Sequence, residues 1–112
     1  MKLGEREVVA AVRRVQLREL RLWVREGWVR PAHGKDGPVY DELDVARIRL
    51  VCDLRKEMSL PPDAVPVVLS LLDQLHGLRR DMHGLLRAVG RQPDATRQAI
   101  AHALREDTGG AQ

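Results

Sequence analysis

The 112-residue chain has no phenylalanine, one tyrosine, two tryptophans and a single cysteine. With so few aromatic side chains we expect a modest, aliphatic core, which is marginal for an isolated chain and favours self-association or a partner. A lone cysteine excludes a disulfide framework, and Cys52 falls among apolar helix positions, where we expect a buried thiol. No apolar run approaches the ~18 residues of a membrane span, and no signal peptide is indicated, so we expect a cytoplasmic protein.

The net charge and the motifs exclude several kinds of function but do not indicate a particular one. Charged residues make up 31% of the chain and the net charge is +3, which permits nucleic-acid contact without requiring it. No nucleophile–histidine arrangement, phosphate-binding glycine loop or carboxylate pair in an apolar context is present. His76 and His83 share a helix face, but no third ligand has suitable spacing. We therefore expect no metal, no other cofactor and no enzymatic activity.

The most informative stretch is LRLWVREGWVRP, residues 20–31. Leu17, Leu20 and Val24 recur at helical spacing and predict one buried helix face. Gly27 then suits a helix C-terminus, where the left-handed conformation is needed and a Cβ would clash. We expect a helix that ends at this glycine.

Helices and strands follow one another closely in the first 40 residues. The pattern predicts helices over about 5–13 and 17–26, then short extended segments at 28–29 and 39–40, joined by the glycine- and proline-containing residues 34–38. Two helices running into a small hairpin are the layout of a winged helix-turn-helix. Such a module binds surfaces, usually DNA, and seldom performs chemistry.

A third helix is predicted from the N-cap Asp41 to about Met58. Pro61 and Pro62 interrupt it, and Asp63 is expected to cap a longer helix. The apolar positions expected to face inward in the third helix are Val45, Ile48, Val51, Cys52 and Leu54.

The long helix carries an unbroken heptad pattern, with apolar residues alternately four and three positions apart. The helix carries more apolar residues than one small domain needs to bury, so we expect it to pair with a second copy in a homodimer. The alternative is that these residues pack on the protein's own domain. The predicted dimer seam begins at Ala64 and continues through Val68, Leu71, Leu75, Leu78, Met82, Leu85 and Val89.

Three segments are therefore expected. Residues 1–60 form the winged helix-turn-helix, residues 61–90 the long dimerisation or interaction helix, and residues 91–112 a short helix with a disordered tail. The short helix is predicted over 95–104 and the tail from Asp107.

Basic residues follow one face of the second helix, the element that enters the major groove in a DNA-binding helix-turn-helix. The alternative is that this is an ordinary solvent-exposed helix face, whose positive charge Glu19 and Glu26 partly neutralise. The candidate DNA contacts are Arg14, Arg18, Arg21 and Arg25, with His33 and Lys35 of the wing.

Residues 41–63 have the opposite balance, with six acids and four bases. Asp53, Glu57 and Asp63 are candidates for an acidic patch that meets a basic partner. The alternative is that they only keep a helix soluble.

The first half of the chain resembles the helix-turn-helix of MerR-type regulators. The MerR pattern is a helix ending in Leu-Arg-aromatic-aromatic, then glycine, two apolar residues, a basic residue and proline, and a wing that ends in an aromatic residue and aspartate. The matching residues are Leu20, Arg21, Trp23, Gly27, Trp28, Val29, Arg30, Pro31, Tyr40 and Asp41.

The chain departs from the MerR pattern at several positions. It has Glu19 where a small hydroxyl residue is usual, Leu22 in place of tyrosine, Val24 in place of glutamate, and Arg14 in place of the turn glycine. A carboxylate facing phosphates is repelled, so Glu19 weakens the DNA interpretation.

The second half resembles the chaperone-modulator family CbpM over residues 53–89. That pattern is Leu-Arg, a basic residue, Glu, an apolar residue and Leu, then a break and a long leucine-rich helix. It is carried by Leu54, Arg55, Lys56, Glu57, Met58, Leu60, Leu71, Leu72, Asp73, Leu75, Leu78, Leu85 and Leu86. Residues 90–112 have no counterpart in it.

This resemblance implies a small bacterial protein that binds the J-domain of a DnaJ/CbpA-like co-chaperone. Such binding hinders stimulation of DnaK and suppresses the co-chaperone's own DNA binding. J-domains present a basic helix, which an acidic surface would complement. On charge alone, we take Asp53, Glu57 and Asp73 as candidate contacts. The alternative function is a MerR-like transcriptional regulator.

Overall fold

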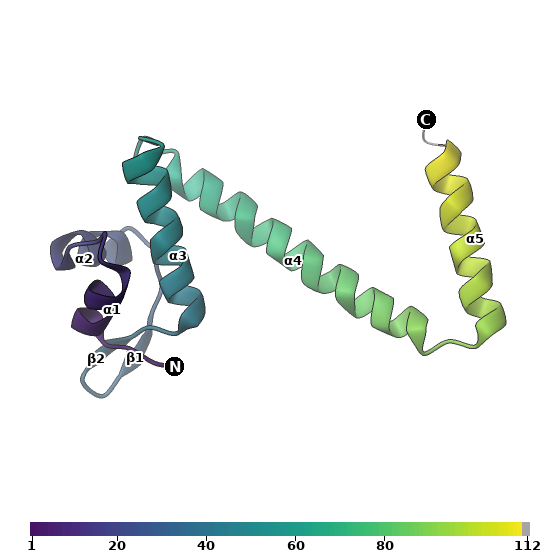
Figure 1. Cartoon of the computed structure of the whole chain (residues 1–112), viewed down its shortest axis with the longest axis horizontal. Helices are drawn as coiled ribbons and strands as arrows, with labels where there is room; N and C mark the ends of the chain where they lie inside the picture. The colour runs from purple at the N-terminus through teal and green to yellow at the C-terminus, as the bar shows by residue number, and fades with distance from the viewer. Residues whose placement is uncertain (111–112) are drawn as a thin grey trace. The chain divides into compact units, whose positions relative to one another are not determined.

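Figure 1 shows an N-terminal helix-turn-helix with a small hairpin, followed along the chain by two longer helices. The computed structural model describes the backbone of residues 1–110 and the side chains of residues 1–108. It divides into two compact units, one from Met1 to Leu71 and one that begins at Leu72. The described residues form five α-helices, one π-helical turn and a two-stranded sheet. The mostly helical winged helix-turn-helix class is confirmed.

The helix-turn-helix consists of α1 (Glu5–Val12) and α2 (Leu17–Arg25), close to the predicted bounds. The connecting turn contains Arg13 in the left-handed conformation, with φ 69°. Its backbone N–H donates to the carbonyl oxygen of Val9 and closes the end of α1. The left-handed residue thus lies one position before Arg14, the residue that stands where MerR proteins usually have a turn glycine.

The buried face of α2 is centred on Leu20 and Trp23. Leu17 and Val24, which the spacing also placed inward, are only partly buried. The buried face of α2 is therefore rotated from the predicted Leu17–Val24 side towards Trp23. The indole ring is larger, and its burial removes more apolar surface from water.

Gly27 ends α2 as predicted. Its φ is 80°, and its N–H donates to Val24 at 3.0 Å while the Trp28 N–H donates to Trp23 at 2.9 Å. These two bonds form the Schellman arrangement that satisfies the last carbonyls of a helix.

The wing pairs β1 (Ala32–Gly34) with β2 (Gly37–Val39) in antiparallel register. The prediction of a strand at residues 28–29 was wrong. The N–H of Trp28 caps α2 and its carbonyl accepts a bond from Arg47 Nε at 2.6 Å, so neither group is free to pair with a strand. Trp28 and Val29 are core residues instead.

Tyr40 pairs with the N-terminus rather than with the wing. Leu3 and Tyr40 exchange two backbone hydrogen bonds, each 2.8 Å long, and the tyrosine side chain is fully buried. The predicted strand at 39–40 is therefore divided: Val39 pairs with β1 of the wing, and Tyr40 pairs with Leu3. The residues before α1 are fixed across the base of the wing.

The third helix, α3 (Glu42–Cys52), continues as the π-helical turn η1 (Asp53–Glu57). Asp41 is its N-cap: the Asp44 N–H donates to Asp41 Oδ1 at 2.8 Å, and the Asp41 N–H donates to Asp44 Oδ2 at 3.0 Å. This reciprocal pair is a capping box. All five apolar residues predicted to face inward are buried.

The core of the first unit extends beyond the predicted domain boundary. Val65 and Leu69 are 0% and 1% exposed and belong to the same cluster as Ile48 and Tyr40. The boundary drawn at residue 60 therefore separates residues that share one core. The core is also less aliphatic than expected, since both tryptophans and the only tyrosine are buried in it.

Two helices complete the chain, α4 (Val65–Gly90) and α5 (Asp94–Gly110). Asp63 was predicted to be the N-cap of α4, which would place the first helical residue at Ala64. The helix instead begins at Val65, so Ala64 is the residue that precedes it. Helix α5 is longer than the predicted 95–104, and residues 107–110, expected to be disordered, are helical. The rest of the predicted tail, residues 111–112, lies outside the described residues.

Replacement of Gly27 by alanine is expected to lower the free energy of unfolding by about 1–2 kcal/mol, because a Cβ is strained at positive φ. Gly77→Ala is the matched control: that glycine lies within α4, where an added Cβ meets nothing closer than 3.8 Å. The control should gain about 0.5–1 kcal/mol. Urea unfolding at one fixed protein concentration measures both, and equal effects of the two variants would contradict the assignment.

Candidate binding surface of the helix-turn-helix

Arg14 does not project freely from the helix-turn-helix. Its Nη1 lies 2.6 Å from Asp53 Oδ1 and 3.3 Å from Glu57 Oε1, and its Nη2 donates to the Arg49 carbonyl at 3.3 Å. A candidate DNA contact is therefore paired with two of the three candidate J-domain contacts. Each pair is more than a third exposed and contributes modestly to stability.

Glu19 is also engaged within the chain. Its Oε1 accepts the Gln16 backbone N–H at 2.9 Å, which caps α2, and lies 2.9 Å from Lys56 Nζ. Lys56 also donates to the Arg14 carbonyl. Partial burial raises the pKa of Glu19, but the hydrogen bonds from Gln16 and Lys56 outweigh it and hold this pKa below its ordinary value. This carboxylate is thus engaged by its own chain, where it closes the turn.

We call these five side chains the turn clamp: Arg14, Glu19, Asp53, Lys56 and Glu57. They join the α1–α2 turn to η1 through alternating charges from segments 37 or more residues apart in sequence. Sequence reasoning found each residue but not the cluster. The available signal was Glu19 itself, a glutamate three residues after the N-cap Gln16, which is the position that closes a capping box.

Arg21 is the second stripe arginine with an internal partner. Its Nε and Nη2 donate to the two carboxylate oxygens of Glu5 at 2.9 and 3.0 Å. This two-pronged geometry is the strongest that arginine and carboxylate form. The hydrogen bond from Arg21 holds the pKa of Glu5 below its ordinary value.

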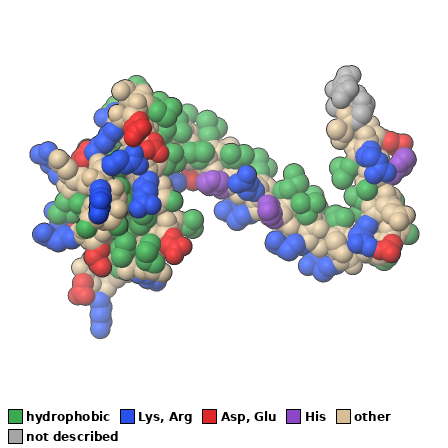
Figure 2. All heavy atoms as spheres, viewed as in Figure 1, with side chains coloured by type: hydrophobic (Ala, Val, Ile, Leu, Met, Phe, Trp, Pro, Cys, Tyr) green, Lys and Arg blue, Asp and Glu red, His purple; other side chains and the backbone are tan. Residues whose placement is uncertain are grey.

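The other four candidate DNA contacts are exposed and form no ion pair within the described residues: Arg18, Arg25, His33 and Lys35. Figure 2 shows basic and acidic side chains interspersed over the visible face of this unit. The predicted stripe of four arginines is reduced to two without carboxylate partners.

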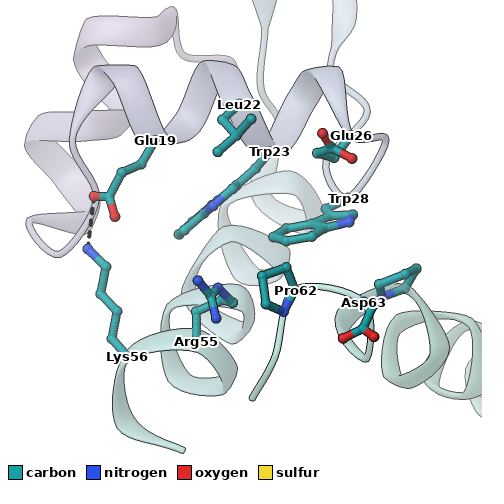
Figure 3. Close-up of a pocket in the computed structure, with 10 residues that line it drawn as sticks. Glu19, Leu22, Trp23, Glu26, Trp28, Arg55, Lys56, Pro62 and Asp63 are labelled. Atoms are coloured by element: carbon teal, nitrogen blue, oxygen red, sulfur yellow. Dashed lines mark hydrogen bonds and ion pairs between the residues drawn. The ribbon is translucent and has the colours of Figure 1, made fainter. Parts of the chain in front are cut away.

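A groove of about 480 Å³ opens beside α2 (Figure 3). It lies between α2, η1 and the proline-containing loop before α4, so tertiary structure alone assembles it. Sequence reasoning did not find this groove. It is lined by Glu19, Leu22, Trp23, Glu26, Trp28, Arg55, Lys56, Pro62, Asp63 and Pro66.

The seam of α4 is exposed along its length. Leu71, Leu75, Leu78, Met82 and Leu85 are each 56–68% exposed, whereas Val68 and Val89 are partly buried. Figure 2 shows hydrophobic side chains along one edge of this helix and basic and histidine side chains along the other.

Three further features carry no site. Burial raises the pKa of the Cys52 thiol, which makes it less reactive. Within the part of the chain that the structure describes, no three metal-ligating side chains are grouped. None of the described helices combines the length and apolar character that crossing a membrane requires.

The family model for MerR HTH family regulatory proteins matches residues 7–71, more than half of the chain. The chain belongs to the MerR helix-turn-helix family. No curated protein and no solved structure gives a significant match. The region matched in this MerR-type protein runs from α1 into α4 and includes the wing, the turn clamp and the groove.

The Glu5–Arg21 pair predicts a pH dependence of stability in this MerR-type protein. Because the pKa of Glu5 is lowered in the folded state, its contribution is present at pH 7 and is lost as the pH falls through that folded pKa. Glu5→Gln should lower the free energy of unfolding by about 0.2–1 kcal/mol at pH 7. This difference should disappear in acid.

A double-mutant cycle with Arg21→Gln isolates this interaction. The coupling energy, measured by urea unfolding, should decline below pH 4.5, the ordinary pKa of the carboxyl. A coupling that is unchanged down to pH 2.5 would contradict the assignment.

Proposed function

We propose that this MerR-type protein is a chaperone modulator that binds the J-domain of a DnaJ/CbpA-like co-chaperone and inhibits it. The turn clamp is the observation that supports this function best. Arg14 and Glu19 are departures from the DNA-binding pattern, and their partners in η1 lie in the segment that resembles the CbpM family. The two halves of the resemblance are thus physically connected, since the residues that replace the DNA-binding pattern bind the residues of the modulator pattern.

The clamp also weakens the attraction of this surface for DNA. Affinity for DNA depends on the number of phosphates that lysine and arginine neutralise. Arg14 and Arg21 already bind carboxylates, so a phosphate would have to displace Asp53 or Glu5. Arg18 and Arg25 remain, which is a small basic surface for a DNA reader.

The contact residues for the J-domain remain a proposal. Asp53 and Glu57 are partly exposed and lie together on η1, where a basic partner can reach oxygens that Arg14 does not occupy. Asp73 lies on α4, in the second unit. Because the first two also hold Arg14, charge-reversal variants there require Arg14→Ala as a control for stability.

We propose further that the functional form is a homodimer that pairs through the α4 seam. Five large apolar side chains more than half exposed in one heptad stripe form the kind of patch that marks an interaction surface. A second copy of the same helix supplies a stripe of the same spacing and length. The small core of the first unit cannot cover these residues as well.

The alternative function is a MerR-like regulator that binds DNA. Family membership favours it, as do the exposed positions of Arg18 and Arg25 on α2 and of His33 and Lys35 on the wing. A DNA reader of this kind should show affinity that falls steeply with salt, and two half-sites separated according to its dimer.

Calorimetric titration with the purified J-domains of the host's DnaJ-like proteins is expected to give a saturable one-to-one isotherm with a Kd of about 1 µM or below, a free energy of at least about −8 kcal/mol. The same protein should bind promoter fragments weakly, and Arg18→Glu should leave J-domain affinity unchanged. If no host J-domain binds and a promoter fragment binds with salt-steep, Arg18-dependent affinity, the regulator is the correct function.

Leu75→Glu combined with Leu78→Glu is expected to shift the protein from dimer to monomer in sedimentation velocity. Each leucine removed from the interface lowers the free energy gained from apolar burial by about 1.5–3 kcal/mol per copy. Leu43→Glu is the matched control, since Leu43 is 80% exposed on α3 and lies outside the seam. A wild-type protein that sediments as a monomer at all concentrations would contradict the dimer.

A further inference from the structure

We propose that the groove beside α2 is the docking site for a lysine- or arginine-bearing apolar segment of the protein's partner. The inference rests on the proposed function in that the partner is the J-domain. It goes beyond the contacts drawn from sequence, because it adds Trp28, Glu26 and Asp63 to the carboxylates of the turn clamp.

The apolar part of the groove is built to receive a side chain. Trp23 and Trp28 are almost completely buried and form its interior, while Leu22, 43% exposed, and Pro62 lie at its opening. The small exposed parts of the two indole rings form an apolar floor, and a cation placed over an exposed ring face is attracted to it. Rigid walls of proline and tryptophan also keep the entropy loss on binding small.

The charges around the groove select a basic occupant. Lys56 is bound to Glu19 in the turn clamp, and Arg55 Nη1 donates to the Leu60 carbonyl at 2.7 Å. The carboxylates of Glu26 and Asp63 form no ion pair or hydrogen bond in the described residues. Lys56 is thus neutralised by a carboxylate, whereas Arg55 is turned to a backbone carbonyl and keeps its charge. The lining as a whole holds three carboxylates against two cations, and the two carboxylates without an ion-pair partner are Glu26 and Asp63.

Figure 3 places these two carboxylates at the Trp28 end of the groove, away from the Glu19–Lys56 pair. A cation held over the groove at this end would meet Glu26, Asp63 and the Trp28 ring together. The apolar residues beside it would contact Leu22 and Pro62. The combined surface is complementary to an amphipathic basic segment.

Glu26 has no evident role in folding. It is the C-cap residue of α2, where the helix dipole disfavours a carboxylate and favours a cation. A negative charge at the wrong end of a helix, with no partner in the described chain, is accounted for by an external cation. Replacing it with lysine should preserve the fold, since surface changes of this type alter stability little.

The two tryptophans of the chain both line this groove, so intrinsic tryptophan fluorescence reports on it alone. Two ligands are titrated into the full chain: the host J-domain, and a helical peptide of alternating leucine- and lysine-rich faces. A peptide with glutamate in place of lysine is the ligand control. The test variant is Glu26→Lys combined with Asp63→Lys, and Asp81→Lys is the protein control for a single charge reversal on α4.

Both ligands are expected to change the fluorescence of the wild-type protein, and the double reversal should weaken both at least about tenfold, as like-charge contacts do. Asp81→Lys should alter neither Kd more than about twofold. Circular dichroism and the urea midpoint of the double variant verify that it remains folded. The glutamate peptide should not bind.

The outcomes separate the groove from the proposed function. A J-domain that binds the wild-type and the double variant equally, with unchanged fluorescence, overturns the groove and leaves the function intact. A lysine peptide that binds through Glu26 and Asp63, while no J-domain does, supports the groove and contradicts the J-domain partner. If neither ligand binds, both are overturned.

Discussion

The size of the core in the first unit is the constraint to which the rest of this protein adapts. Fifteen buried side chains, including all three aromatic residues of the chain, fill the space between α1, α2, α3 and the first turns of α4. Val65 and Leu69 are the last residues of α4 in this core. The seam leucines that follow, from Leu71 to Leu85, are exposed, so the same limit that closes the domain leaves an apolar stripe uncovered.

Ion pairs across the turn change the character of the helix-turn-helix surface. The turn contains no glycine, and the charged residues around it are held by η1 through the turn clamp. Exposed ion pairs of this kind each add little stability. Their main effect is to decide which charged side chains remain available to a partner. They engage the charges of Arg14 and Glu19 within the chain, while Glu26 and Asp63 at the tryptophan-lined groove keep carboxylates without an ion-pair partner in the described residues.

Local signals in the sequence predicted a large part of this architecture. Gly27 as the end of α2, Asp41 as the cap of α3 and the five inward residues of α3 all followed from chemistry within one helix turn. The strand predicted at 28–29 was wrong, and the core of the first unit continues past residue 60. In both places a residue is engaged by a distant partner, Arg47 in the case of Trp28 and the main core in the case of Val65.

The sequence by itself determined the existence of the helices, the end of α2, the cap of α3, the heptad spacing and the family pattern, because each depends on residues within a few positions of one another. Only the tertiary structure decided which charges are free and where a ligand can enter. The partners of Arg14, Glu19 and Arg21 lie 16 to 43 residues away, and the groove joins residues from Glu19 to Pro66. Spacing along the chain carries no information about such pairings, since they arise only when the core brings the segments together.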